Sequence, residues 1–274
     1  MQNLAQCFPN VFIASKLEAV VYASYSRLQA EINCMLDLLE RQEKWEYMIN
    51  LVGQVFPLKT NREIVKILKI YNGANDIEGM AKEKFMYFRI NHKYKIEGNK
   101  LVMTEQRKES PPGKLKLVKG SAYGVFSRAF LQYTLVDDAL SKELLRWSED
   151  TKTPDEHFWA TLNHMGGALN SHIRTPPGGF NASLPEKKDW LAVYALWSWR
   201  SCKGKVVRDV CVFGVGDLHT LVNKEYLFAN KFYMDFEHLA LDCMQEWYSN
   251  RTFYAPFFNT TYYENLPFII PSNK

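Results

Sequence analysis

The stretch Glu46-Tyr-Met-Ile-Asn-Leu-Val-Gly-Gln-Val-Phe56 contains a continuous apolar run, which is typical of a strand buried on both faces. Pro57 ends this run, and Thr60-Asn-Arg-Glu63 then has the pattern of a capping box, with a helix predicted to continue as far as Gly73. Before this stretch, a short apolar run and a second predicted helix, beginning at Ser26, repeat the same order. Alternating strands and helices predict an α/β domain.

The later part of the chain continues this alternation after a long polar excursion over residues 74–118. We expect a helix across Arg128–Trp147 and a strand over Val206–Phe213. Residues 250–274 are aromatic and polar without periodicity, and we predict that this tail is irregular.

The composition is that of a soluble globular protein with a substantial core, since 47% of the 274 residues are hydrophobic and 23% are charged. The net charge of +4 comes from dispersed Lys and Arg, so a nucleic-acid partner is not indicated. No apolar run approaches the ~20 residues that a membrane-spanning helix needs, and no signal-peptide pattern follows Met1. Zinc-binding motifs and Asp-x-Asp are also absent from the sequence, so we expect no metal site.

The stretch Thr153-Pro-Asp-Glu-His-Phe-Trp-Ala160 allows two interpretations. It has the pattern of a helix start in which the Glu156 carboxylate reaches back to the N–H of Thr153 as part of a capping box. Alternatively, Glu156 is a general base directed into a cleft, with the neighbouring aromatic residues supplying an apolar wall. The local pattern does not decide between the two.

Two cations and two indole side chains are further candidates for ligand-binding residues. Arg208 and Lys231 could act together as an electrostatic clamp on a pyrophosphate group, although most surface cations are simply solvated. Trp197 and Trp199 share a face of a predicted strand, and they are either core residues or a platform for the apolar face of a sugar ring.

The cysteines and glycosylation sequons suggest an extracytoplasmic protein. Cys202 and Cys211 could close a small disulfide loop, within an odd total of five cysteines. Three sequons, at Asn181, Asn250 and Asn259, are candidates for N-glycosylation.

Together, several ordered blocks give the chain a resemblance to the core 2 and I-branching β-1,6-N-acetylglucosaminyltransferases, glycosyltransferase family 14. The resemblance covers about Cys7 to Glu246. Its blocks include Asn10–Ser15, Val21–Arg27, Phe56–Asn61, Gly120–Tyr123, Pro154–Glu156, Val207–Gly214 and Leu227–Phe232.

The resemblance implies a GT-A-like fold, with a mixed sheet flanked by helices, in a protein anchored to the Golgi membrane with its catalytic part in the lumen. Residues 1–249 would be part of the catalytic domain. The enzyme would transfer GlcNAc from UDP-GlcNAc to a galactose- or GalNAc-containing glycan, with inversion and without a metal or other cofactor. Glu156 would be the base, and Arg208 and Lys231 would hold the diphosphate. The acceptor would contact Glu78, Arg89, Trp197 and Trp199.

The sequence also departs from the family pattern. Met86 stands where core 2 enzymes carry a lysine that contacts the acceptor, and Trp199 stands where they carry tyrosine. We expect the membrane anchor and the first strands of the nucleotide-binding half to be absent from this chain, and Cys7, Cys34 and Cys243 to pair in the family with cysteines of that part. Two alternatives therefore stay open: a non-catalytic product that retains at most sugar or diphosphate binding, and an unrelated cytosolic α/β protein.

Overall fold

The computed structural model of this chain describes residues 2–80, 84–166, 170–180, 190–198 and 200–269. These residues form two compact units, and each unit is described here by itself. Unit 1 comprises Met1–Met48, Glu78–Ala122 and Phe126–Lys188, and unit 2 comprises Ile49–Ile77, Tyr123–Val125 and Asp189–Lys274.

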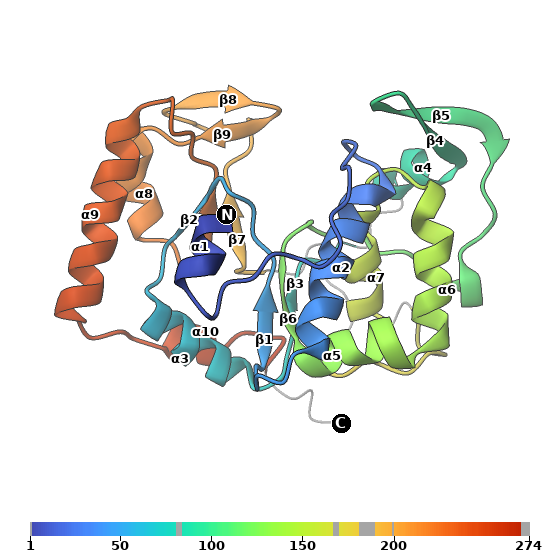
Figure 1. Cartoon of the computed structure of the whole chain (residues 1–274), viewed down its shortest axis with the longest axis horizontal. Helices are drawn as coiled ribbons and strands as arrows, with labels where there is room; N and C mark the ends of the chain where they lie inside the picture. The colour runs from blue at the N-terminus through green and yellow to red at the C-terminus, as the bar shows by residue number, and fades with distance from the viewer. Residues whose placement is uncertain (1, 81–83, 167–169, 181–189, 199, 270–274) are drawn as a thin grey trace. The chain divides into compact units, whose positions relative to one another are not determined.

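Unit 1 is mainly helical, with one long hairpin. Ser24 caps α2 by accepting the N–H of Ser26, and Asp138 caps α6 by accepting the N–H of Ser141. Its elements are α1 (Gln2–Cys7), α2 (Tyr25–Glu40), α4 (Lys84–Ile90), the antiparallel strands β4 (His92–Glu97) and β5 (Lys100–Arg107), α5 (Arg128–Gln132), α6 (Ala139–Trp147) and α7 (Phe158–Asn163) (Figure 1).

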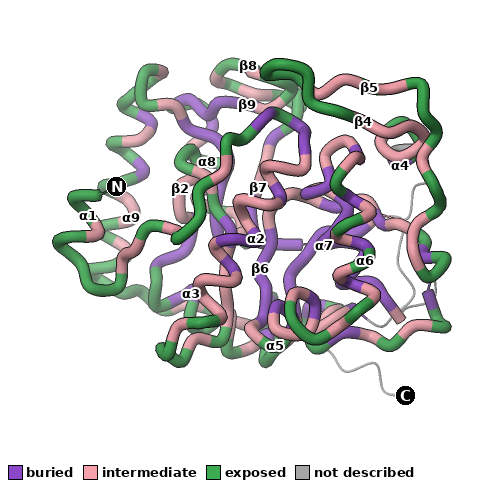
Figure 2. Tube along the Cα trace, turned by 45° about the vertical axis from the view of Figure 1, so that its right-hand side comes forward, coloured by how far each residue is buried: buried purple, intermediate pink, exposed green. Residues whose placement is uncertain are grey.

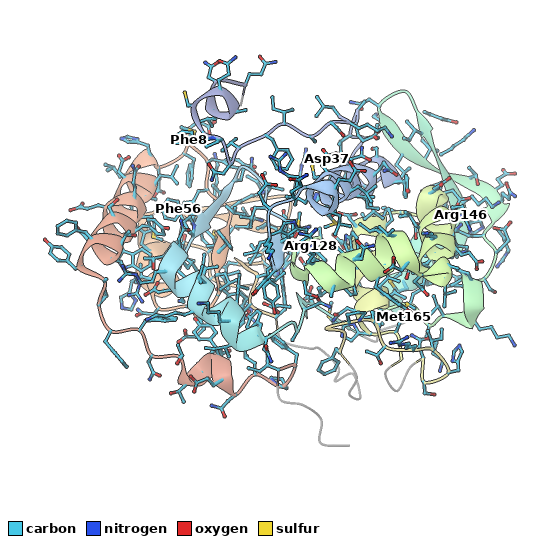
Figure 3. The ribbon with its side chains drawn as sticks, turned by 60° about the horizontal axis from the view of Figure 1, so that its bottom comes forward. Phe8, Asp37, Phe56, Arg128, Arg146 and Met165 are labelled. Carbon is cyan, nitrogen blue, oxygen red and sulfur yellow. A yellow bond between two sulfur atoms is a disulfide. The ribbon has the colours of Figure 1, made fainter. Side chains whose placement is uncertain are left out.

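The core of unit 1 is built around Trp159 in α7, whose residues are all buried (Figure 2). The ring of Trp159 lies 5.2 Å from that of Phe126 and 4.8 Å from that of Phe158, both in edge-to-face geometry. At the start of α5, the guanidinium of Arg128 donates to the carbonyls of Leu39 and Glu43, which ties α5 to the end of α2 (Figure 3). The aromatic contacts of Trp159 thus pack α7 into this core.

Unit 2 contains small sheets covered by helices. In one sheet, β10 (Phe228–Asn230) is antiparallel to β2 (Val55–Pro57) and parallel to β7 (Val193–Ala195). A two-stranded hairpin consists of β8 (Lys205–Val207) and β9 (Val210–Val212). A further sheet has the order β1 (Tyr47–Ile49), β6 (Gly124–Ser127) and β3 (Asp76–Ile77), and the residues of β1 and β6 are divided between the two units. The helices are α3 (Asn61–Tyr71), α8 (Leu218–Val222), α9 (His238–Tyr254) and α10 (Thr261–Glu264).

The core of unit 2 joins the β2–β10–β7 sheet and β9 to α8 and α9. Phe56 lies on β2 (Figure 3), and its ring centroid is 5.8 Å from that of Phe232 and 6.3 Å from that of Tyr248 of α9. The buried members of this core are Leu58, Leu196, Cys211, Phe213, Leu221, Ala229, Phe232, Ala240 and Met244.

The prediction of a mixed α/β fold is confirmed, because the structure combines helices with small sheets. Several element predictions are wrong. The apolar run at residues 46–56 forms two short strands, β1 and β2, instead of one, and the expected strand at Val206–Phe213 is the β8–β9 hairpin. The expected helix at Arg128–Trp147 is interrupted before the cap at Asp138.

The prediction of an irregular tail from residue 250 is also wrong. Helix α9 continues to Tyr254, and α10 follows at Thr261–Glu264. The buried ring of Tyr263 carries a hydroxyl that donates to the carbonyl of Glu225 (2.9 Å), so tertiary contacts order a segment without periodicity.

None of the helices in the described part of the chain is both long enough and apolar enough to cross a membrane.

Replacing Thr60 by alanine is expected to lower the free energy of unfolding by about 1 kcal/mol. The predicted capping box is present: Thr60 Oγ1 accepts the N–H of Glu63, and the Glu63 carboxylate accepts the N–H of Thr60 (2.9 Å). Urea unfolding measures the loss. Thr220→Ala, at an exposed position inside α8, serves as the control and is expected to change stability by less than about 0.5 kcal/mol.

Candidate functional site

The stretch Thr153–Ala160 does not form the predicted capping box. Thr153 has a left-handed backbone (φ 48°) and its side chain caps no helix, while its N–H donates to the carbonyl of Ala23 (2.7 Å) instead of to the Glu156 carboxylate. Pro154–Glu156 form a single 3-10 turn, and α7 begins only at Phe158. The Glu156 carboxylate is therefore not used in a cap, and the first of the two interpretations is wrong.

The carboxylate of Glu156 is held by two cations. Its Oε2 accepts from Arg89 Nη2 at 2.8 Å and lies 3.4 Å from Lys119 Nζ. The side chain of Glu156 is 30% exposed, whereas those of Arg89 and Lys119 are 12% and 16% exposed. Arg89 also bonds to the hydroxyl of Thr153. All the described contacts of the carboxylate are thus made by Oε2, on a side chain that solvent still reaches.

The backbone beside Glu156 is tightly packed at Gly120. The N–H of Gly120 donates to the carbonyl of Glu156 (2.7 Å), and a Cβ at this position would lie 2.5 Å from the carbonyl oxygen of Glu78. Only glycine fits here without a shift of the backbone. Of the predicted site residues of unit 1, Arg89 thus contacts Glu156 directly, whereas Glu78 is buried and lies with its backbone beside Gly120.

Lys119 is a site residue that the sequence interpretation missed. It directly precedes the block Gly120–Tyr123, but it lies in a polar region without periodicity, where one lysine among several carries no signal. Its position is set by the bridge between Lys119 and Met80 and by the bond of its Nζ to the Gly120 carbonyl (2.8 Å).

Both neighbours of Glu156 are buried ionisable groups. Asp155 Oδ2 accepts from Arg27 Nε of α2 at 2.7 Å, while Oδ1 is buried without a hydrogen-bond partner in the described structure. Burial raises the pKa of Asp155 to about 6, although Arg27 acts in the opposite direction. Burial lowers the pKa of His157 to about 3, so this imidazole is neutral at physiological pH.

An Asp155→Asn variant is expected to gain stability relative to the parent protein as the pH rises from 4 to 6. The folded-state pKa of Asp155, about 6, exceeds the ordinary pKa of an aspartate, 3.8, so in this window the folded state holds a proton that the unfolded state has lost. The parent protein therefore loses stability with rising pH, by up to about 1 kcal/mol per pH unit, and the variant lacks this contribution. Urea unfolding of both proteins at several pH values measures the difference. A difference that does not change with pH would show that Asp155 titrates normally.

Three further predicted residues, all in unit 2, belong to the β8–β9 hairpin or contact it: Arg208, Lys231 and Trp197. Arg208 and Asp209 form its two-residue turn with φ of 52° and 63°, the left-handed pair of a type I′ turn. Lys231 is buried, and its Nζ donates to the carbonyl of Val207 (2.9 Å), the residue before Arg208. Trp197, 41% exposed, pairs with Val210 across the edge of the same hairpin.

A disulfide joins Cys202 and Cys211, whose Cα atoms are 5.7 Å apart, and it anchors the segment that leads into the hairpin. The other three cysteines, Cys7, Cys34 and Cys243, are free thiols. Asn250 and Asn259 are exposed, as a glycosylated asparagine must be. Trp199 and Asn181 lie outside the described residues.

Comparison with a family model and with known proteins points to one family of enzymes. Residues 1–222 match the model of the family described as "Branch: Core-2/I-Branching enzyme". The chain is 40% identical over 260 residues to a human protein named beta-1,3-galactosyl-O-glycosyl-glycoprotein beta-1,6-N-acetylglucosaminyltransferase. The matched region covers 90% of this chain and 59% of the human protein.

Two other relatives show the same extent of similarity. The sheep protein with the same name and the number 3 is 38% identical over 93% of this chain and 59% of its own length. The mouse protein with the number 4 is 41% identical over 90% of this chain and 55% of its own length. The chain thus spans less than two thirds of the length of these relatives.

Proposed function

Because this chain belongs to the Core-2/I-branching enzyme family, we propose that the protein transfers GlcNAc from UDP-GlcNAc to a glycan in β-1,6 linkage. The acceptor is a galactose- or GalNAc-containing glycan, so the reaction branches an O-glycan. We further propose a GT-A-like fold for the catalytic domain and a location in the lumen of the Golgi. There the full-length family protein would be anchored in the membrane as a type II protein, with glycans at exposed asparagines.

Glu156 is the general base in this proposal. The observation that carries the assignment is the half-buried carboxylate whose Oε2 is fixed by Arg89 and Lys119, while Oε1 has no described partner. Glu156 takes the proton from the 6-hydroxyl of the acceptor, and the acceptor oxygen forms a bond to C1 of GlcNAc as the bond from C1 to the diphosphate breaks. A single displacement of this kind inverts the configuration at C1.

Arg208 and Lys231 are proposed to bind the diphosphate of the donor. As UDP leaves, negative charge grows on its β-phosphate, and the two cations, one in the turn of the β8–β9 hairpin and one hydrogen-bonded to that hairpin, stabilise the charge without the need for a metal ion. Glu78, Arg89, Trp197 and Trp199 are proposed to contact the acceptor. In this arrangement Arg89 would both orient Glu156 and bind the sugar.

The test is transfer by the purified protein from UDP-GlcNAc to core 1 and polylactosamine acceptors, with and without a chelator. The proposal predicts a β-1,6-linked product whose rate of formation is unchanged by the chelator, with the linkage and anomeric configuration read by NMR. A product that forms only when metal is added would contradict the metal-independent mechanism. Diphosphate binding without any transfer would instead support the non-catalytic alternative.

A further inference from the structure

The ammonium group of Lys231 is buried but has few partners. The residue is 8% exposed, and the one hydrogen bond described for Nζ goes to the carbonyl of Val207. An ammonium group has three N–H donors, and buried donors are nearly always satisfied. None of the described carboxylates forms an ion pair with it. The remaining donors therefore point to an anionic ligand at this end of the hairpin.

A second lysine, Lys205, lies on the same hairpin. It belongs to β8 and is exposed, and its Nζ lies 4.3 Å from the centroid of the Phe236 ring and 5.5 Å from that of Tyr233. Tyr233 also has Lys231 Nζ at 5.4 Å from its centroid. The half-buried ring of Tyr233 therefore lies near two ammonium groups, that of Lys205 on β8 and that of Lys231 directly after β10.

This arrangement brings like charges together. Lys205, Lys231 and Arg208 all belong to the hairpin or contact it, and no described ion pair joins either lysine to a carboxylate. The negative face of an aromatic ring offsets part of the repulsion between nearby cations, since it attracts each of them. A multivalent anion would offset the rest, because each phosphate oxygen accepts charge-assisted hydrogen bonds from lysine or arginine.

We propose that Lys205 is a third phosphate-binding cation beside Arg208 and Lys231, and that Tyr233 is the positioning residue that holds the two lysines around the anion. The ligand class is a diphosphate, free or as part of a nucleoside diphosphate. This inference rests on the proposed diphosphate role of Arg208 and Lys231, and it adds Lys205 and Tyr233 to that site.

The test measures the binding of inorganic pyrophosphate by isothermal titration calorimetry at low ionic strength. Lys205→Gln is expected to weaken binding about three- to five-fold, the upper part of the range for one exposed charge pair. Lys69→Gln is the matched control, because Lys69 is an exposed lysine of unit 2 on α3 and its replacement changes the net charge equally. We expect it to change affinity by less than about two-fold.

The role of Tyr233 is tested by two replacements. Tyr233→Phe keeps the ring and is expected to retain the parent affinity, whereas Tyr233→Leu keeps apolar bulk without the ring and is expected to weaken binding several-fold. If Leu and Phe behave alike, the ring does not position the lysines. If Tyr233 positions the lysines, Tyr233→Leu also changes the salt dependence of pyrophosphate binding. If the role of Tyr233 is purely structural, this salt dependence stays as in the parent protein.

The outcomes separate this inference from the proposed function. If Lys231→Gln weakens pyrophosphate binding but Lys205→Gln matches Lys69→Gln, the inference is wrong and the diphosphate role of Lys231 stands. If the parent protein binds inorganic sulfate as tightly as pyrophosphate, the site does not select a diphosphate and the inference is wrong. If the parent protein does not bind pyrophosphate at all, both the inference and the proposed diphosphate site fail.

Discussion

Replacing Glu156 by glutamine is expected to lower the rate of GlcNAc transfer by about three orders of magnitude, within the range by which a general base accelerates proton transfer. Glutamine has nearly the shape of glutamate and can still accept from Arg89, but it cannot take a proton from the acceptor hydroxyl. Because a base acts in the transition state, we expect kcat to fall while the affinity for UDP-GlcNAc stays the same.

The control for this variant is Glu143→Gln, which makes the same change of charge at an exposed position of α6 in the same unit. It should retain full activity. Loss of the Glu156 charge also leaves Arg89 and Lys119 without their shared carboxylate, so thermal unfolding and pyrophosphate binding must be measured on the same preparation. A folded Glu156→Gln protein that keeps more than about a tenth of the parent kcat would show that Glu156 is not the base.

Replacing Lys231 by glutamine is expected to weaken the binding of UDP-GlcNAc and of pyrophosphate by about 10- to 100-fold. A hydrogen bond between a charged donor and a phosphate contributes roughly 1.5–3 kcal/mol, and Lys231 is nearly buried, so bulk water replaces little of this contact. Titration calorimetry of the variant beside Lys69→Gln measures the loss.

The salt dependence of binding distinguishes Lys231 from the exposed cations. Charges that are buried are screened less than charges on the surface, so the effect of Lys231→Gln should persist at high salt, while that of Lys205→Gln should shrink. If the losses of affinity caused by Lys231→Gln and Lys205→Gln decrease equally with salt, Lys231 acts only through long-range attraction between the positive surface and the anion. It would then not be in contact with the phosphate.

Local sequence patterns predicted the structure well where no residue distant in the sequence forms a competing contact. Two stretches have the same pattern of a threonine followed three residues later by glutamate. At Thr60-Asn-Arg-Glu63 the capping box forms as predicted. At Thr153-Pro-Asp-Glu156 it does not, because Arg89 bonds to both the threonine hydroxyl and the glutamate carboxylate. Arg89 lies more than sixty residues before Thr153 and Glu156 in the sequence, so its contacts with them cannot be predicted from a stretch of four residues.

The candidate site shows the same limit. Resemblance to the family indicated Glu156, Arg208 and Lys231, but it gave no indication of Lys119 or Lys205. These two lysines are placed by strand pairing, through the bridge to Met80 and the register of β8 with β9. The hairpin itself was predicted as one strand, because its turn residues are Arg208 and Asp209 and not the Asn-Gly pair that usually marks a type I′ turn.

That turn has a consequence for the evolution and engineering of the protein. An arginine in the left-handed region costs roughly 1 kcal/mol that glycine would avoid. A laboratory selection for heat resistance alone would therefore favour glycine at position 208, and it would discard the guanidinium that we assign to the diphosphate. Retention of arginine under natural selection would mean that ligand binding, and not the thermal tolerance of the hairpin, determines which residue is kept at this turn.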